Sequence, residues 1–158
     1  MLIVRQARNL LKKHRVDQWQ GEYPAEENFR IDIAKGICYV IEYGGRMAAF
    51  FTMADTPEED YVNLTDGKWH GSGPYCTMHR AAVAAEFRGT GLSERIYEFA
   101  EEIARGKGIH EMRVDTHRKN KAMLALLKRK GYVYRGNVKV SSEPGHDPAR
   151  QAFEKIGL

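Results

Sequence analysis

The segment from Ala82 to Leu92 predicts a strand that runs through a glycine-containing turn directly into an amphipathic helix. Gly89 and Gly91 allow the backbone to turn tightly and to approach a ligand closely. The first turn of a helix has backbone N–H groups without intrahelical partners and carries the positive end of the helix dipole. With Arg88 beside it, such a turn is suited to bind phosphate groups, although an ordinary tight turn has the same pattern.

Apolar periodicity predicts further helices and strands on both sides of this turn. The predicted helices cover residues 3–15, 26–35, 92–103 and 120–130. The predicted strands cover residues 37–43, 47–53, 75–83, 111–116, 132–140 and 151–156. Gly44 and Gly45 separate the first two strands, and two glycines at this point predict a tight hairpin because both turn positions favour positive φ.

The order of these elements indicates an α+β fold. Two helices are followed by three strands, a helix, a strand, a helix and two strands, which is neither an all-helical pattern nor a regular βα alternation. A mixed sheet with helices on its faces satisfies this order. The length of 158 residues suits one domain over residues 1–158.

Composition narrows the class of protein. Hydrophobic residues make up 42% and charged residues 29%, which is typical of a globular domain. The apolar opening Met1–Val4 is too short for a signal peptide or a membrane span, so we expect a cytoplasmic protein without a membrane partner. Cys38 and Cys76 are too few for a disulfide framework or a zinc cage, so we expect reduced core thiols and no metal.

The net charge of +4 is mildly basic and suits an anionic small molecule as well as a solvated surface. The basic residues are scattered among acidic ones, and no base-stacking motif is present. We therefore do not expect a nucleic-acid partner.

The glycine turn lacks the Gly-Lys-Ser/Thr of a Walker loop and the third glycine of a dinucleotide fingerprint. The run Arg88-Gly89-Thr90-Gly91-Leu92, preceded by Ala82-Val83, instead resembles the acetyl-CoA motif of the GNAT family of N-acetyltransferases. Several other segments are similar to a bacterial branch of this family: Asp17-Gln18-Trp19-Gln20, Tyr23-Pro24, His79-Arg80, Asp115-Thr116-His117, Lys130-Gly131-Tyr132 and Arg150 to Lys155.

The resemblance implies a mixed, mostly antiparallel sheet that is splayed at the acetyl-CoA site and has helices on both faces. It implies acetyl-CoA as cosubstrate, a small-molecule or peptide amine as partner, and a homodimer as a possible assembly. The residues that it assigns to cofactor binding are Ala82, Val83, Arg88, Gly89, Thr90, Gly91, Leu92, Ser93 and Asn120.

Three features depart from the family pattern. Ser93 stands where the motif has Gly or Ala, which is tolerable because serine is small and favoured near helix starts. The family usually opens with a strand, whereas this sequence begins within the first helix, so we expect either that this strand is missing or that the start codon is assigned too late. Leu127 stands where many members carry the tyrosine that protonates the leaving thiolate.

The activity implied by the resemblance is transfer of acetyl from acetyl-CoA to a primary amine by direct attack. A free amine has a pKa near 10 and is almost all ammonium at neutral pH, so the site must remove a proton before the attack. The alternative is a module of the same fold that binds acetyl-CoA without turnover, which the leucine at position 127 favours.

His79 is the candidate base, because histidine has an ordinary pKa of about 6.5 and exchanges protons near neutral pH. It lies four residues before Val83, so strand periodicity predicts that both side chains point to the same face of the sheet. A purely structural histidine is the alternative at this position.

The residue that would protonate the leaving thiolate is less clearly indicated by the sequence than the base. Tyr39, Tyr132 and Tyr134 offer hydroxyls; Tyr132 is expected to pack in the core, and Tyr134 is taken as the candidate. Asn120 is expected either to cap its helix or, as the resemblance implies, to contact the pantetheine or pyrophosphate arm as well.

Three aromatic residues, Trp19, Tyr23 and Trp69, lie in predicted loops. Loop aromatics often line binding sites, so they are candidates for the acceptor side. The alternative is that they plug the open end of the sheet.

Overall fold

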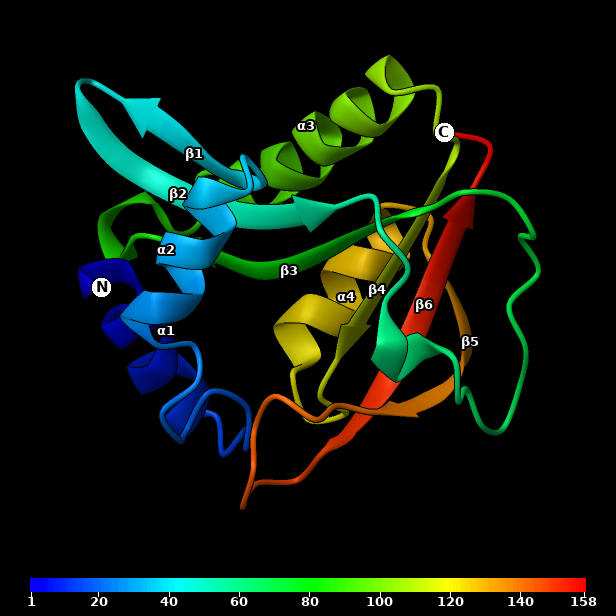
Figure 1. Cartoon of the computed structure of the whole chain (residues 1–158). Helices are drawn as coiled ribbons and strands as arrows, with labels where there is room; N and C mark the ends of the chain where they lie inside the picture. The colour runs from blue at the N-terminus through cyan, green and yellow to red at the C-terminus, as the bar shows by residue number, and fades with distance from the viewer.

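Six strands form one sheet in the computed structural model, which describes residues 1–158 (Figure 1). The strands are β1 (Cys38–Tyr43), β2 (Arg46–Ala54), β3 (Cys76–Val83), β4 (Glu111–Thr116), β5 (Val133–Lys139) and β6 (Ala149–Ile156). Their spatial order is β1-β2-β3-β4-β6-β5. All neighbours are antiparallel except β3 and β4, so the mixed, mostly antiparallel sheet expected from the sequence is confirmed.

Four helices cover the two faces of the sheet (Figure 1). They are α1 (Leu2–Lys13), α2 (Glu26–Ala34), α3 (Leu92–Gly106) and α4 (Lys121–Arg129). Successive side chains of a strand point to opposite faces, and Phe50 and Phe51 on β2 show the division. Phe50 packs in a cluster with residues of α1, whereas Phe51 packs in the main core with residues of α3 and α4.

The sheet opens between β3 and β4. Only Cys76 and Thr77 of β3 pair with β4, opposite Met112 and Arg113. From Met78 onward the two parallel strands diverge, because no further ladder pairs join them. The splay expected at the cofactor site is therefore confirmed, and it leaves the C-terminal ends of both strands open to a ligand.

A β-bulge in β3 changes which side chains share a face. Thr52 pairs with His79 and Phe50 pairs with Ala82, so Phe51 alone stands opposite Arg80 and Ala81. Arg80 has φ +49°, a left-handed conformation that is uncommon outside glycine. The prediction that His79 and Val83 point to one face is wrong, because one inserted residue reverses the alternation beyond it.

The packing of β3 shows this reversal. Met78 before the bulge and both Ala81 and Val83 after it contact the main core. Ala82 packs in the cluster on the opposite face with Phe50. His79 thus faces away from the main core, toward the ring of Tyr61, at a centroid distance of 6.2 Å.

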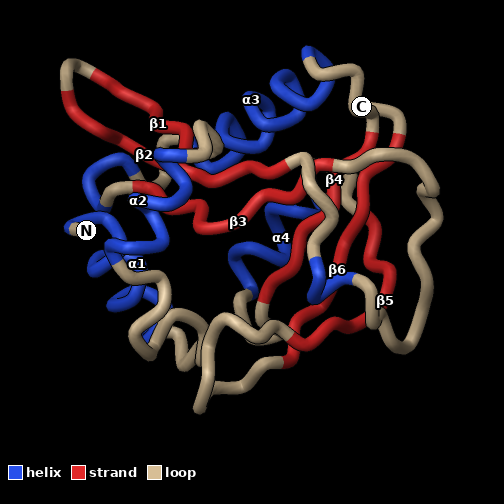
Figure 2. The backbone as a smooth tube through the Cα atoms, in the orientation of Figure 1, coloured by secondary structure: helices blue, strands red, loops and turns tan.

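Two long connections complete the fold (Figure 2). The connection from Asp55 to Tyr75 covers the outer face of β5 and β6, where Tyr61 packs with Val138 and Ala152. The connection from β5 to β6 runs across the lower end of the sheet toward the segment after α1. No strand precedes α1 in the structure, and no helix combines the length and apolar character needed to cross a bilayer.

Candidate active site

A cleft of about 370 Å³ lies at the open end of the sheet, where β3 and β4 diverge. Its walls come from α1, the segment after α1, β3, the start of α3, the end of β4, α4 and the connection before β6. Of the residues expected to bind the cofactor, Ala82, Val83, Arg88, Ser93 and Asn120 line this cleft. Gly89, Thr90, Gly91 and Leu92 form the turn that joins Arg88 to Ser93.

The glycine turn presents free backbone donors beside the cleft. None of the N–H groups from Gly89 to Ser93 has an acceptor within the protein. Gly89 has φ +79° and Gly91, the N-cap of α3, has φ +83°, and glycine adopts such values without steric cost. The Thr90 hydroxyl donates to the Phe87 carbonyl at 2.7 Å and so holds the turn closed. Free N–H groups at a helix start are suited to phosphate oxygens.

Asn120 acts as the N-cap of α4, as one of the two interpretations predicted. Its Oδ1 accepts a hydrogen bond from the backbone N–H of Met123 at 3.3 Å. Its side chain also lines the cleft, so a cofactor contact remains open to it.

Two variants separate these roles of Asn120. Asn120→Ala should lower the free energy of unfolding by about 1 kcal/mol, because the first turn of α4 loses its cap. Asn120→Asp keeps a capping oxygen and should retain most of the stability. If the amide also contacts the pyrophosphate arm, both variants bind acetyl-CoA more weakly in calorimetric titration. Unchanged affinity in both would restrict Asn120 to capping.

His79 lies between two carboxylates at the floor of the cleft. Its Nε2 is 3.0 Å from Oε2 of Glu58, and its Nδ1 is 4.0 Å from Oδ1 of Asp115. The same Asp115 oxygen accepts a hydrogen bond from the Tyr61 hydroxyl at 2.8 Å. His79 and Asp115 line the cleft, whereas Glu58 contacts the imidazole ring without lining the cleft itself.

The carboxylates of this group have shifted pKa values. The hydrogen bond from His79 lowers the pKa of Glu58, so Glu58 carries its negative charge across the neutral range. Burial raises the pKa of Asp115, and the nearby His79 opposes that shift. The two carboxylates therefore contact the two ring nitrogens of His79 in different environments, with Glu58 the more readily ionised of the pair.

Sequence reasoning missed Glu58, which has no local signal. It lies in a polar segment, 21 positions before His79. The connection is folded back onto the sheet by the buried Tyr61, and this tertiary contact is what brings Glu58 to the histidine.

Arg80, next to the histidine, also lines the cleft. It forms a two-point ion pair with Asp32, with distances of 2.7 and 2.8 Å from its Nε and Nη2 to the two carboxylate oxygens. Its Nη1 donates to the Tyr23 hydroxyl at 2.7 Å. The ion pair connects α2 to the bulge in β3, and the hydrogen bond to Tyr23 connects the segment after α1 to the same bulge.

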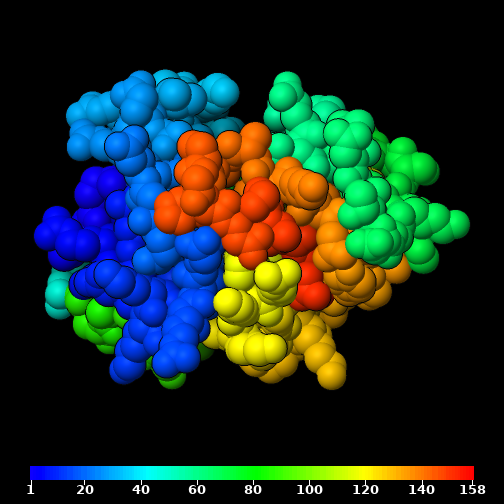
Figure 3. Space-filling view, turned by 90° about the horizontal axis from the view of Figure 1, so that it is seen from below, coloured from blue at the N-terminus to red at the C-terminus, as the bar shows by residue number.

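The connection before β6 closes the lower side of the cleft. Glu143 accepts hydrogen bonds from the backbone N–H of Trp19 and from Nη2 of Arg150. His146 and the backbone N–H of Asp147 bind the carboxylate of Asp17 at 2.8 and 2.9 Å. In Figure 3 this orange connection lies between the blue N-terminal segment and the yellow start of α4.

The structure places the loop aromatics in different regions. Trp19, which is buried, and Tyr23 line the cleft, as one interpretation predicted. Trp69 does not, because its ring stacks over the Arg113 guanidinium at 4.4 Å and its Nε1 donates to the Tyr61 carbonyl. The expectation that Trp69 flanks the acceptor side is wrong.

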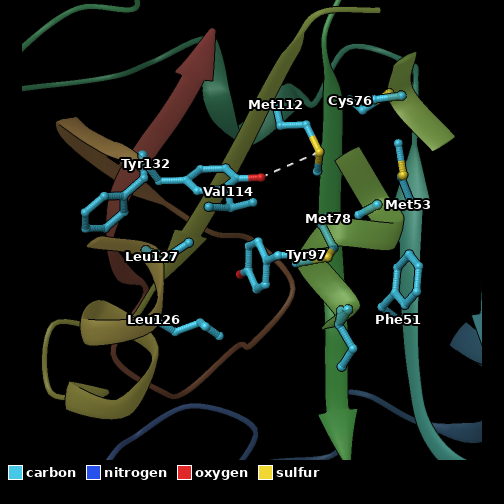
Figure 4. Packing of buried hydrophobic residues seen from close by; sticks show 14 of the residues in the cluster. Phe51, Met53, Cys76, Met78, Tyr97, Met112, Val114, Leu126, Leu127 and Tyr132 are labelled. Carbon is cyan, nitrogen blue, oxygen red and sulfur yellow. Dashed lines mark hydrogen bonds between the residues drawn. The ribbon is translucent and has the colours of Figure 1, made fainter. Parts of the chain in front are cut away.

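The candidate acid Tyr134 does not lie with His79. It is on β5, 43% exposed, with its ring against Phe153, and it is not part of the cleft lining. Tyr132 packs in the core as expected, with its hydroxyl against the Met112 sulfur (Figure 4). Leu127 is fully buried in the same core.

Tyr97 on α3 is the tyrosine that sequence reasoning missed. Its side chain is 1% exposed, it lines the cleft, and its hydroxyl lies 3.5 Å from the Met123 sulfur. Burial raises the pKa of Tyr97, so the hydroxyl keeps its proton. Burial also raises the pKa of the Cys76 thiol to about 11, which leaves no reactive thiolate there.

The fold and site thus combine a mixed sheet splayed between β3 and β4 with free N–H donors at the start of α3. Residues 4–132 match the acetyltransferase (GNAT) family, and the chain belongs to this family.

Named relatives agree with this assignment. The chain is 29% identical over 142 residues to the uncharacterized N-acetyltransferase YesJ of Bacillus subtilis, covering 85% of this chain and 74% of that protein. A GNAT-family acetyltransferase from Streptococcus agalactiae superposes with a TM-score of 0.87 at 33% identity, over 100% of this chain and 88% of that one. A Bacillus subtilis acetyltransferase solved in complex with CoA has the same fold, with a TM-score of 0.64 at 13% identity and 86% of each chain covered.

Proposed function

We propose that this acetyltransferase moves an acetyl group from acetyl-CoA to a primary amine by direct attack of the amine. The observation that carries the proposal is a single cleft that joins the free N–H groups of the glycine turn to the His79 pair with Glu58 and Asp115. One end is suited to bind a diphosphate and the other to take a proton from an ammonium.

The residues present fit the cosubstrate. The unpaired N–H groups from Gly89 to Ser93 provide donors for the diphosphate, and Arg88, which has no acidic partner, adds a positive charge. The gap between β3 and β4 has room for the pantetheine arm because their pairing stops after Thr77. The structural relative from Bacillus subtilis was solved in complex with CoA, which supports an acyl-CoA as the ligand of this fold. When bound, acetyl-CoA supplies the thioester that the amine attacks.

The chain's own groups serve the two proton transfers. His79 accepts the proton of the incoming ammonium, and Glu58 and Asp115 stabilise the resulting imidazolium. Tyr97 lines the cleft and keeps its hydroxyl proton, so it is the group that donates a hydrogen bond to the leaving sulfur, in place of the tyrosine absent at position 127, while that sulfur takes up a proton from solvent. No covalent enzyme intermediate is needed.

The test is a thiol-release assay with acetyl-CoA and a panel of polyamines, aminoglycosides, amino acids, peptides and simple amines. Release of CoA that depends on one class of amine, with the acetylated amine identified by mass spectrometry, would establish the activity. The buried Leu127 favours the alternative of a binding module. Tight binding of acetyl-CoA without thiol release in any amine would favour that alternative.

The pH dependence of turnover tests the role of Glu58. The carboxylate is charged at neutral pH because the hydrogen bond from His79 lowers its pKa, and this charge favours the imidazolium that forms when the amine gives up its proton. In Glu58→Gln the charge is lost, so the rise of kcat/KM with pH should move to lower pH, by about one pH unit. A profile that does not move, or that moves to higher pH, would contradict this role.

A further inference from the structure

We propose that the acceptor is a primary amine on an apolar body with no carboxylate beside the amine, so that α-amino acids are rejected. This inference rests on the proposed function and specifies its substrate class. It follows from how the charged groups are distributed along the cleft.

The two arginines at the acceptor end are both paired with carboxylates of the protein. Arg80 is held by both oxygens of Asp32 and by the Tyr23 hydroxyl. Arg150, whose side chain is 1% exposed, donates to Glu143 and to the backbone carbonyls of Asp147 and Ala149. Neither arginine offers an uncompensated charge to a substrate carboxylate.

Negative groups outnumber these cations. Asp115 and Glu143 line the cleft, and Asp32 and Glu58 stand directly behind Arg80 and His79. An ammonium gains from this surplus of negative charge, whereas a carboxylate is repelled by it and loses its water without a compensating partner.

The unpaired polar atoms of the cleft point to the same class of ligand. The side-chain oxygens of Gln18 and Thr116 are buried and have no hydrogen-bond partner in the protein, and both residues line the cleft. Thr116 is 1% exposed and directly follows Asp115. The Gln18 amide oxygen only accepts hydrogen bonds, and the Thr116 hydroxyl can accept as well as donate, so both can serve a ligand that presents N–H donors.

An apolar wall faces these charges. Ala7, Leu10 and Leu11 of α1 and the rings of Trp19 and Tyr23 line the cleft. They provide a surface for the carbon skeleton of the amine. The free cation of the cleft, Arg88, lies instead at the glycine turn, where the phosphates are expected. Positive and negative groups are thus divided between the two ends of the cleft.

The first experiment compares three probes that share one skeleton: tyramine, L-tyrosine and L-tyrosinamide. Tyrosinamide has the size of tyrosine without the negative charge. We expect tyramine and tyrosinamide to be acetylated with kcat/KM at least about 100-fold above that of tyrosine. Equal or better turnover of tyrosine would overturn the proposal. Rejection of tyrosinamide together with tyrosine would overturn it too, because size would then be the cause.

A binding measurement tests the substrate class independently of the acetyl-transfer activity on which the inference rests. Calorimetric titration of the CoA-loaded protein with the same probes needs no turnover. Tighter binding of tyramine and tyrosinamide than of tyrosine supports the inference even if no acetyl transfer occurs, in which case only the proposed function fails. Tighter binding of tyrosine, or no binding of any probe, overturns the inference whatever the activity.

A gain-of-function variant tests the role of charge compensation. Asp32→Asn frees the charge of Arg80, although Asp32 itself does not line the cleft. We expect the preference for tyramine over tyrosine to fall at least about tenfold, with most of the change in binding of tyrosine. Asp55→Asn removes the same charge from a surface pair with Lys107 and serves as the matched control. An unchanged preference in folded Asp32→Asn, or the same change in both variants, would contradict the proposal.

Discussion

His79→Ala is expected to lower kcat about 10²-fold or more, the usual scale for loss of a general base. The affinity for acetyl-CoA should hardly change, because His79 lies with Glu58 and Asp115 rather than at the glycine turn. Turnover is measured in the thiol-release assay and the affinity by calorimetric titration. The rise of activity with pH should become weaker without vanishing, because the amine substrate also loses its proton as the pH rises.

A structural role for His79 makes a different prediction. His79 contacts two partly buried carboxylates, so its removal leaves them without this polar partner and should also lower the melting temperature. His79→Gln keeps an N–H donor for Glu58 without a basic nitrogen, and it should recover stability but not turnover. Melting temperature and kcat are therefore measured on the same preparation of each variant. Near-normal kcat in either folded variant would remove His79 from the mechanism.

Gly91→Val is expected to weaken acetyl-CoA binding at least about tenfold. The side chain would stand at the N-cap of α3, beside the free N–H groups that are expected to meet the diphosphate. The substitution should also lower the stability of the fold. Gly91 has φ +83°, and a side-chain-bearing residue in this region costs about 1–2 kcal/mol.

Gly108→Val provides the control for this strain. Gly108 has φ +72°, with open space around an added Cβ, as at Gly91, but it follows the far end of α3. Both variants should lose stability, and only Gly91→Val should lose affinity for acetyl-CoA in calorimetric titration. Undiminished affinity in Gly91→Val, or equal losses in the two variants, would refute the assignment of the diphosphate to this turn.

Local signals predicted most elements of this protein. The paired glycines at 44 and 45 predicted the β1–β2 hairpin, because few other residues adopt the required backbone conformation. The apolar period of 3.6 predicted α3, whose stripe from Ile96 to Ala104 packs against the sheet. The boundaries of β6 were less certain, since the strand begins at Ala149, two residues earlier than expected.

Local sequence was sufficient to predict the backbone donors at one end of the cleft. A strand, a glycine turn and a helix start are contiguous in the chain, so local backbone preferences place the N–H groups of Gly89 to Ser93 together. The histidine was also visible, but its surroundings were not. The β-bulge at Arg80 places every later side chain of β3 on the face opposite to the one that a regular strand predicts. No local sequence pattern predicted this bulge.

The arrangement of charged groups at the acceptor end depends on long-range packing. Glu58 and Asp115 meet at His79 because the connection before β3 folds back onto the sheet and β4 lies beside β3. Glu143 reaches the same cleft from the connection between β5 and β6. The compensation of Arg80 by Asp32 depends in the same way on how α2 packs against the sheet. Long-range packing sets such contacts, and packing depends on the whole chain rather than on any window of it.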